Sequence, residues 1–303
     1  MAQKPVVKEP QSQTEIKARP KAKKRSQWAE VWKRIRKNKA AMVGMFIIGV
    51  LVFTAIFAPL IAPYGYDEQN PEVRRQGPSA DHIFGTDHFG RDVFSRVVYG
   101  SRISIQVGFI AVGLAMVVGG MLGSIAGYYS GRIDNVIMRI MDVFMAIPGI
   151  LLAIAIAAAL GPGLVNVMIA VGIGSVPRYA RIVRASVLSI RDQEFVEAAK
   201  AMGANDFRII IKYILPNCMA PIIVQGTLGV AEAILSAAGL SFIGLGIELP
   251  RPEWGAMLSE AQNYIRTDWH MSVFPGLAIM VTIFGLNLLG DGLRDALDPR
   301  LKG

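Results

Sequence analysis

The sequence predicts an all-α integral membrane protein with six transmembrane helices and one further helix at the N-terminal side. Apolar residues make up 52% of the 303 positions and charged residues only 18%, which is less charge than an average soluble domain carries. Long runs without charged side chains recur along the chain, and segments rich in lysine and arginine separate them. This alternation is typical of a multi-pass membrane protein.

The first segment, residues 1–27, is basic and poor in large apolar side chains, so it cannot bury enough surface to offset the entropy of ordering. We expect a disordered cytoplasmic tail there. From Trp28, apolar residues such as Trp32 and Ile35 recur at helical spacing, and lysine and arginine occupy the opposite face. The pattern predicts an interfacial helix, and residues 28–62 comprise this helix and the first transmembrane helix.

The first transmembrane helix corresponds to residues 40–62, an uncharged run of 23 residues. As a helix it would be about 34 Å long, enough to cross a hydrocarbon core of roughly 30 Å. The 39 preceding residues contain 13 basic and three acidic side chains, unlike the short basic lead of a signal peptide, so we expect a retained anchor. Because most of the net charge of +9 lies in this leading segment, the positive-inside bias explains it, and no nucleic acid partner is expected.

Five further spans are expected within residues 103–290, the core of the protein. One charge-poor run, 143–177, would be about 52 Å long as a single helix, so Gly161-Pro162-Gly163 is expected to divide it into two spans. The other runs are 103–131, 213–247 with Glu232 inside it, and 271–290.

Basic residues predict the orientation of these spans. The segments on one side hold 25 lysines and arginines, and those on the other side hold seven. Because the more basic side faces the cytoplasm, both termini are expected inside the cytoplasmic membrane, with residues 63–102 and 241–270 outside and residues 291–303 as a cytoplasmic tail. The single cysteine, Cys218, excludes an intrachain disulfide and is expected to be a small packing residue.

Three glycines of the second span, Gly119, Gly123 and Gly127, recur at i, i+4 and i+8 and so lie on one helix face. Bare backbone on this face allows another helix to approach closely. We favour a packing role, with a sliding gate surface as the alternative.

The most informative segment is the predicted cytoplasmic loop 178–216. Its first part has an apolar stripe at helical spacing, and its middle has Gly203, which suits the left-handed conformation that ends a helix. A second apolar stripe leads to Pro216, which is tolerated in the first turn of the following helix. The two stripes consist of Phe195, Ala198 or Ala199, and Met202, and of Phe207, Ile210, Ile211 and Ile214.

Two short helices with a glycine joint form a knob that fits a groove of another protein. A loop that only lies on lipid is the alternative. At the start of this loop Arg178, Arg181 and Arg184 recur at i, i+3 and i+6, where they would anchor the fourth span at the lipid headgroups or, alternatively, meet a partner protein.

The run Glu197-Ala198-Ala199, followed by Gly203 and Leu215-Pro216, resembles the EAA loop of ABC importer permeases, here residues 192–217. Tyr213 stands where the general pattern has isoleucine, and Ala237 where many relatives have glutamate. The resemblance covers residues 28–303 and is to the C-type permeases of the dipeptide, oligopeptide and nickel family. Further matching motifs are Gly85-Thr86-Asp87, Gly90-Arg91-Asp92, Pro252-Glu253-Trp254-Gly255, Phe274-Pro275-Gly276 and Gly290-Asp291-Gly292.

This resemblance implies the six-helix type I importer permease fold and the import of short peptides, with nickel or a glycan fragment as alternative substrates. The implied partners are a homologous B-type permease, two ATPase subunits at the cytoplasmic face, an extracytoplasmic substrate-binding protein and the lipid bilayer. The residues implied to receive force from the ATPases are Glu197, Ala198, Ala199, Gly203, Leu215 and Pro216.

The chain itself is expected to be neither an enzyme nor a cofactor-binding protein, because it has no Gly-x-x-x-x-Gly-Lys-Ser/Thr run for a nucleotide phosphate. A metal or catalytic site on the outer loop is a weak alternative, since its two histidines are six residues apart and do not share a helix face. Solvated loop residues are the favoured interpretation of this group, which consists of Asp81, His82, Asp87 and His88.

An ion-coupled secondary carrier is the remaining alternative, because an ionisable residue within a span is a functional candidate. Glu232 is the only isolated candidate in the sequence. Arg139 and Asp142, at i and i+3, are expected to pair with each other.

Overall fold

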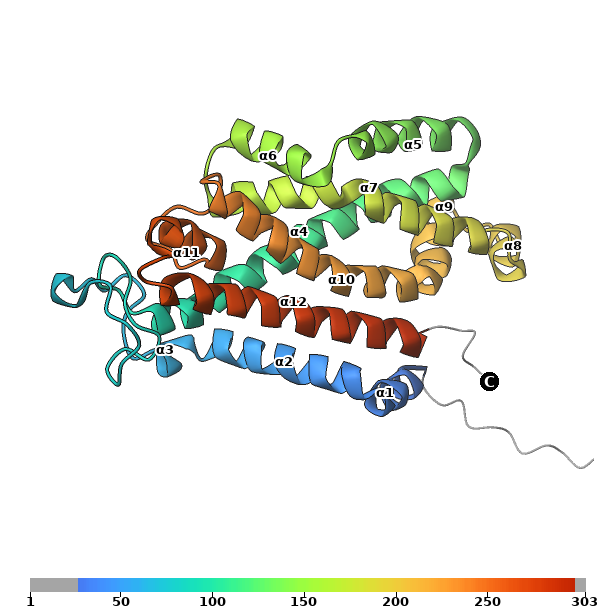
Figure 1. Cartoon of the computed structure of the whole chain (residues 1–303). Coiled ribbons are helices and arrows are strands. Elements are labelled where there is room, and N and C mark those ends of the chain that lie inside the picture. Colours follow the sequence, from blue (N-terminus) through green and yellow to red (C-terminus); the bar gives the residue numbers. More distant parts are fainter. Residues whose placement is uncertain (1–26, 298–303) are drawn as a thin grey trace, which may run out of the picture.

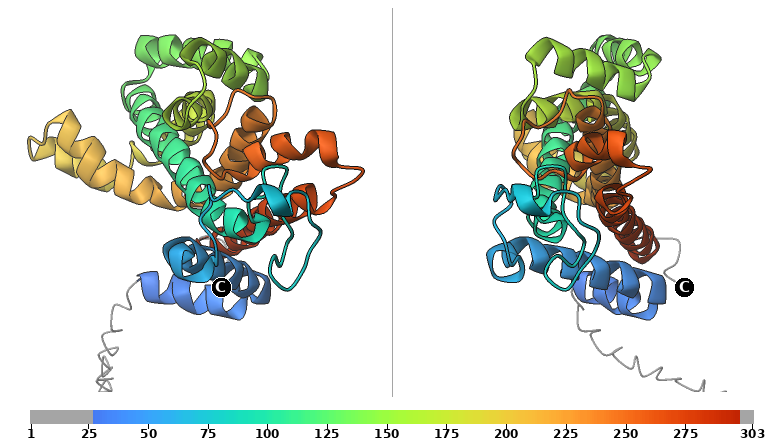
Figure 2. Two further views of the ribbon diagram at one scale, coloured as in Figure 1. Left: turned by 90° about the vertical axis from the view of Figure 1, so that its left-hand side faces the viewer. Right: turned by 60° about the vertical axis from the view of Figure 1, so that its left-hand side comes forward.

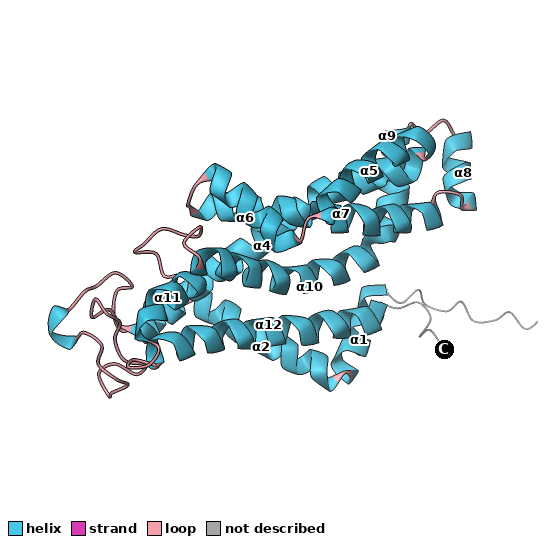
Figure 3. Cartoon of the chain, turned by 45° about the horizontal axis from the view of Figure 1, so that its top comes forward, coloured by secondary structure: helices cyan, strands magenta, loops and turns pink. Residues whose placement is uncertain are grey.

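The computed structural model describes residues 27–297, which form a bundle of helices without a strand (Figures 1 and 3). The all-α prediction is confirmed for these residues, whereas most of the predicted N-terminal tail and the end of the C-terminal tail lie outside them. The longer helices are α1 (Gln27–Lys37), α2 (Lys39–Ile56), α4 (Val93–Tyr129), α5 (Gly131–Ala146), α6 (Gly149–Leu160), α7 (Leu164–Ile190), α8 (Glu194–Ala201), α10 (Leu215–Phe242), α11 (Trp254–Ala261) and α12 (His270–Leu297). The shorter ones are α3 (Ala58–Ile61), α9 (Asp206–Arg208), the 3-10 turns η1 (Pro71–Val73) and η3 (Gln262–Tyr264), and the π-helix η2 (Ile209–Ile214).

Four helical segments in the described part are long and apolar enough to cross a membrane, namely α2, α4, α12 and the continuous helix Asp206–Phe242 that contains α10. The pair α5 and α6 would be a fifth span, although its halves are bent by 91°. Pro148 causes this break, since a proline disfavours helical backbone in the preceding residue, and Ile147 is extended. The remaining predicted span, the fourth along the chain, corresponds to α7, which carries three arginines, so the count of six stays a prediction.

The glycine-bearing face of α4 packs against α7, as predicted. A Cβ atom added to Gly123 would lie 2.3 Å from the carbonyl oxygen of Ala180, and one added to Gly119 would lie 2.6 Å from that of Val176. No real Cβ atom tolerates such distances, so the two backbones approach as closely as they do because these positions are glycine. Sliding along this face stays untested.

Helix α7 runs from Leu164 to Ile190 and does not end at Pro177, where the charge-poor run stops. Pro177 removes one backbone hydrogen bond from the helix interior, yet the helix continues. The predicted loop 178–216 is wrong at its start, because residues 178–190 are helical.

Two arginines of α7 bind carboxylates of α5. Arg181 Nη2 lies 2.5 Å from Asp142 Oδ1, and Arg184 Nη2 lies 2.6 Å from Asp134 Oδ2. The predicted pairing of Arg139 with Asp142 is therefore wrong, because Asp142 binds a residue 39 positions away. These ion pairs join two helices, and anchoring at lipid headgroups stays a prediction.

Helix α4 begins at Val93, ten residues before the charge-poor run that predicted it. Asp92 caps this helix by accepting a hydrogen bond from the backbone of its first turn. Arg96 of the first turn and Arg91 just before the helix share one distant carboxylate. Arg96 Nη2 lies 2.9 Å from Glu260 Oε2 of α11, and Arg91 Nη2 lies 2.5 Å from Glu260 Oε1. Both arginines are 1% exposed, so this network ties the outer loop to α11.

The outer-loop group of histidines and aspartates does not converge. Within residues 27–297 no three His, Cys, Asp or Glu side chains come together as metal ligands do. His82 Nδ1 lies 3.0 Å from Asp92 Oδ1, and both His82 and Asp87 are buried. The prediction that these are solvated loop residues is therefore wrong for two of them, although Asp81 is exposed and His88 half-buried.

The bundle has two distinct ends (Figure 1). The loops that precede α4 and α12 lie at one end, and α1, α8 and the C-terminal end of α12 lie at the other. Asn38 separates α1 from α2 and accepts a hydrogen bond from Ala41 N. The described chain therefore begins and ends at the end where α8 lies.

Candidate functional site

The segment that joins α7 to α10 forms a helical hairpin, which projects sideways from the bundle (Figure 2). It consists of α8, a turn at residues 202–205, and the α9–η2 helix that continues into α10. We call residues 194–214 the α8–α9 hairpin. Because α7 leads into this hairpin and α10 leads out of it, the position of the hairpin is linked to two long helices of the bundle.

Helix α8 is amphipathic, and its inner face differs from the predicted stripe. Val196 and Ala199 are completely buried, whereas Phe195 and Ala198 are exposed. The stripe is thus divided between the two faces, because Val196 and not Phe195 turns toward the bundle. Glu197 stands in the first turn, is exposed, and is favoured there by the helix dipole.

Gly203 ends α8 in the predicted left-handed conformation, with φ of +79°. The Gly203 N–H donates to the Lys200 carbonyl at 2.9 Å, and the Ala204 N–H donates to the Ala199 carbonyl at 3.1 Å. These two bonds define a Schellman motif. Among residues 27–297, no atom lies within 4 Å of an added Cβ at this position, so backbone conformation and not space requires glycine there.

The second arm of the hairpin begins at Asn205, whose side chain accepts a hydrogen bond from Arg208 N at 2.9 Å. Its turns widen into the π-helix Ile209–Ile214 just before Leu215 and Pro216, the first two residues of α10. A proline cannot donate to the carbonyl four residues earlier and clashes with it, and a wider turn relieves this conflict. The predicted place of Pro216 in the first turn is confirmed, but the helix is continuous across it.

An apolar cluster lies beneath the hairpin and holds it on α7. Cys218 is completely buried within this cluster, which confirms its prediction as a packing residue. The cluster joins α7, α8, η2 and α10, and it contains Val183, Val187, Val196, Ala199, Ile209, Ile214, Cys218 and Ile222.

Polar contacts attach the hairpin to the end of α4. The Tyr128 hydroxyl donates to Asp206 Oδ1 at 2.8 Å, and Arg191 Nη1 donates to the Gly127 carbonyl at 3.1 Å. The Lys200 ammonium lies 5.4 Å from the Tyr128 ring centroid, within cation–π range. The sequence pattern did not single out these residues, because their partners are separated by 60 or more positions.

The outer surface of the hairpin exposes large apolar side chains. Met202 is 76% and Phe207 75% exposed, with Ile211 at 49% and Phe195 at 37%. Exposed apolar groups concentrated on one projecting segment are typical of an interaction surface.

The six predicted coupling residues do not form one patch. Glu197, Ala198, Ala199 and Gly203 lie in α8 and the turn that follows it. Leu215 and Pro216 lie at the base of the hairpin, where α10 begins. Glu197, Ala198, Gly203 and Pro216 are exposed, Leu215 is half-buried against the apolar cluster, and Ala199 is buried.

Comparison with known families identifies the chain. Residues 119–303 match the family described as binding-protein-dependent transport system inner membrane component. The chain belongs to this permease family. Residues 26–78 also match the N-terminal transmembrane domain of oligopeptide transport permease C.

Curated relatives are similar to this permease over nearly their whole length. The dipeptide transport system permease protein of Alkalihalophilus pseudofirmus is 54% identical, over 91% of each chain. The glutathione transport system permease protein of Escherichia coli is 47% identical, over 92% of each chain. The di/tripeptide transport system permease protein of Pseudomonas aeruginosa is 44% identical, over 90% of this chain and 92% of the relative.

A solved structure shares the fold of this permease. It is an inward-facing conformation of the MetNI methionine ABC transporter, with a TM-score of 0.55 and 19% sequence identity. The similarity covers 68% of this chain and 97% of the other. At this identity the similarity shows a shared fold only.

Proposed function

We propose that this permease is one transmembrane half of an ATP-driven importer of short peptides. The observation that carries the proposal is similarity over about nine-tenths of the chain to permeases named for dipeptides, di/tripeptides and glutathione, at 44 to 54% identity. Glutathione is itself a tripeptide, so all three names share one substrate chemistry.

The α8–α9 hairpin is the part through which partner ATPases drive transport. Its exposed apolar groups supply a contact surface, and its Schellman turn and buried cluster make it a stiff unit. A push on this unit reaches α7 and α10 directly and α4 through Tyr128. Glu197, Ala198, Gly203 and Pro216 contact the ATPase in this scheme, while Ala199 and Leu215 hold the hairpin in place.

The membrane arrangement in this proposal has six spans, with α7 as the fourth. Ion pairs neutralise the arginines of α7, which lowers the cost of placing them in a membrane. Both termini face the cytoplasm, since the described chain begins and ends where the hairpin lies (Figure 1), and α1 lies on the inner leaflet. The partners are a homologous B-type permease, two ATPases and an extracytoplasmic binding protein, as the binding-protein-dependent family implies.

Uptake of labelled di- to pentapeptides by vesicles tests the proposal. The vesicles carry the permease with its partner proteins, and uptake is compared with hydrolysable ATP and with a non-hydrolysable analogue. We expect uptake only with hydrolysable ATP. Uptake of nickel but not of peptides would change the substrate, and uptake without ATP would contradict the importer and favour an ion-coupled carrier.

A further inference from the structure

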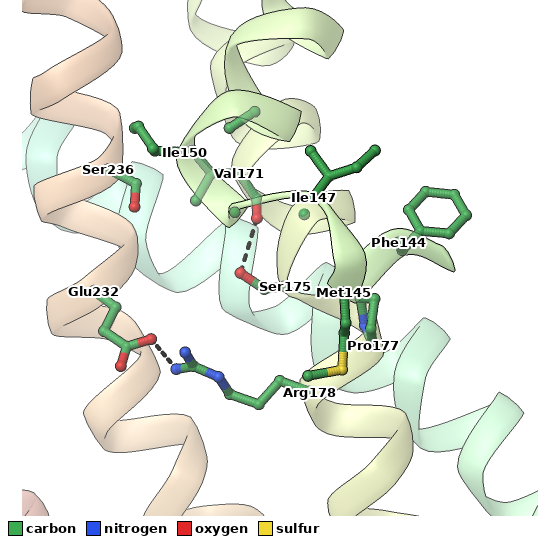
Figure 4. A pocket seen from close by; sticks show the side chains of 13 residues that line it. Phe144, Met145, Ile147, Ile150, Val171, Ser175, Pro177, Arg178, Glu232 and Ser236 are labelled. Carbon is green, nitrogen blue, oxygen red and sulfur yellow. Dashed lines mark hydrogen bonds and ion pairs between the residues drawn. The ribbon is translucent and has the colours of Figure 1, made fainter. Parts of the chain in front are cut away.

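A cavity of about 230 Å³ lies between the α5–α6 junction, α7 and α10 (Figure 4). Its wall combines apolar side chains, with Phe144 and Ile150 on one side and Val171 on another, with polar groups that include Ser175 and Ser236. Among the described residues that line it, only Arg178 of α7 and Glu232 of α10 are ionisable. Figure 4 shows the Arg178 side chain extending from α7 to Glu232, with which it forms an ion pair.

This ion pair lies near the middle of the bundle along the direction of its helices. Arg178 follows the first residue of α7 by 14 positions, and Glu232 precedes the last residue of α10 by ten. At 1.5 Å per residue the two Cα atoms lie about 21 Å and about 15 Å from the outer end of the bundle. In a hydrocarbon core of roughly 30 Å, this depth is close to the middle of the membrane. Because Glu232 pairs with Arg178, the prediction of Glu232 as an isolated ionisable residue is wrong.

The same pair is open to its surroundings. The side chains of Arg178 and Glu232 are 49% and 57% exposed. Charges that face lipid at this depth are strongly unfavourable, whereas charges that face a water-filled pathway mark the route of a substrate. The open side of this cavity therefore borders the transport pathway and not the bilayer.

We propose that this cavity is a transit subsite for the charged termini of a short peptide, an inference that rests on the proposed import function. Arg178 binds the α-carboxylate and Glu232 binds the α-ammonium group. An arginine and a carboxylate that neutralise each other match a ligand with one charge of each sign, because each protein group exchanges one partner for another and neither is left unpaired.

The remaining wall fits a carrier of varied peptides. Apolar side chains accept different peptide side chains without selecting among them. The volume is below the roughly 300–1,000 Å³ of typical ligand pockets, as suits a site that a substrate occupies briefly and leaves. Charge at both ends of the ligand, and not its side chains, is what this cavity recognises.

Uptake of three alanine dipeptides tests the inference: the free, the N-acetylated and the C-amidated form. They are compared in vesicles with the complete importer and ATP, for wild type, Arg178→Gln and Glu232→Gln. We expect each variant to take up free dipeptide about tenfold more slowly, since one charge-assisted bond is lost. Glu232→Gln should lower the preference for a free amino terminus only, and Arg178→Gln the preference for a free carboxyl terminus only. Selection by the binding protein is equal in all variants and cancels in these ratios.

The matched control is the double variant Arg181→Gln with Asp142→Asn, which removes another exposed α7 ion pair that does not line the cavity. It should keep the wild-type preferences. Occupancy is measured separately through Ser236→Cys, since Ser236 lines the cavity and the native Cys218 is buried. With partner proteins that lack reactive cysteines, free dipeptide should slow alkylation of this thiol in wild-type background and not in the double variant Arg178→Gln with Glu232→Gln.

The outcomes separate this inference from the proposed function. If wild type imports peptides with ATP but the variants keep its terminus preferences, or if dipeptide gives no protection of the cysteine, the subsite is overturned and the import function stands. If wild type imports no peptide, the import function fails and the subsite fails with it.

Discussion

Replacing Gly203 with valine tests whether the turn of the α8–α9 hairpin is needed for coupling. No atom of the described part of the chain lies within 4 Å of an added Cβ, so the substitution causes no clash there and its effect comes from the backbone. Left-handed backbone costs a non-glycine residue about 1–2 kcal/mol, and a β-branched residue is disfavoured further. A loss of this size lowers the ratio of formed to broken Schellman turn by a factor of about 5–30. The bonds from Gly203 and Ala204 to α8 would be lost.

The matched control is Gly203→Asn, because asparagine tolerates the left-handed conformation and also ends helices in this way. We expect ATP-driven peptide uptake in vesicles to fall about 5- to 30-fold for Gly203→Val, in line with the altered population, and to stay near wild type for Gly203→Asn. Uptake is compared at equal amounts of assembled complex. Equal uptake by the two variants would refute the requirement for left-handed geometry at this position.

Three further predictions concern stability, measured by thermal unfolding of the purified complex in detergent. Glu260→Gln should destabilise by about 1–3 kcal/mol, since two buried arginines lose one of the two carboxylates that they share and keep Asp87; an unchanged Tm would contradict the network. Gly123→Ala should lower the stability of the complex by about 1–3 kcal/mol, because the added Cβ meets the Ala180 carbonyl. The control Gly120→Ala faces open space among the described residues and should leave stability unchanged. Equal effects of the two variants would count against close packing of α4 on α7. Burial lowers the pKa of His88 below its ordinary value of 6.5, because the folded protein favours the neutral imidazole. The contribution of His88 to the free energy of unfolding is therefore complete above pH 6.5 and is lost as pH falls through the lowered pKa. His88→Gln should remove this part of the pH dependence, and identical pH profiles would exclude it.

The parts of the site that were predictable from sequence depend on local backbone chemistry. Gly203 ends a helix and Pro216 stands in the first turn of another, because glycine and proline impose these geometries whatever surrounds them. The face of α8 that packs inward was not predictable in the same way. Phe195 and Val196 are both apolar neighbours, and only the position of α7 beneath the hairpin decides that Val196 is buried.

The predicted ends of the helices are wrong for a related reason. Hydropathy predicts that a membrane helix ends near a charged residue, yet Arg96 and Arg178 both lie inside longer helices. Glu260 and Glu232, which pair with Arg96 and Arg178, are 164 and 54 residues away in sequence, although Arg96 Nε also lies 3.7 Å from Asp87 Oδ2. One sequence does not show which distant carboxylate neutralises an arginine, so hydropathy alone shortens such helices.

The same distant pair connects the two functional proposals. Helix α7 enters the α8–α9 hairpin and α10 leaves it, so a displacement of the hairpin acts on both helices at once. Halfway along the bundle these two helices are joined again by Arg178 and Glu232. Because side chains in a packed bundle have discrete arrangements and do not deform continuously, a change in the spacing of α7 and α10 makes or breaks this ion pair. If both proposals hold, the energy that the hairpin receives from the ATPases shifts Arg178 and Glu232 between binding each other and binding the termini of a peptide.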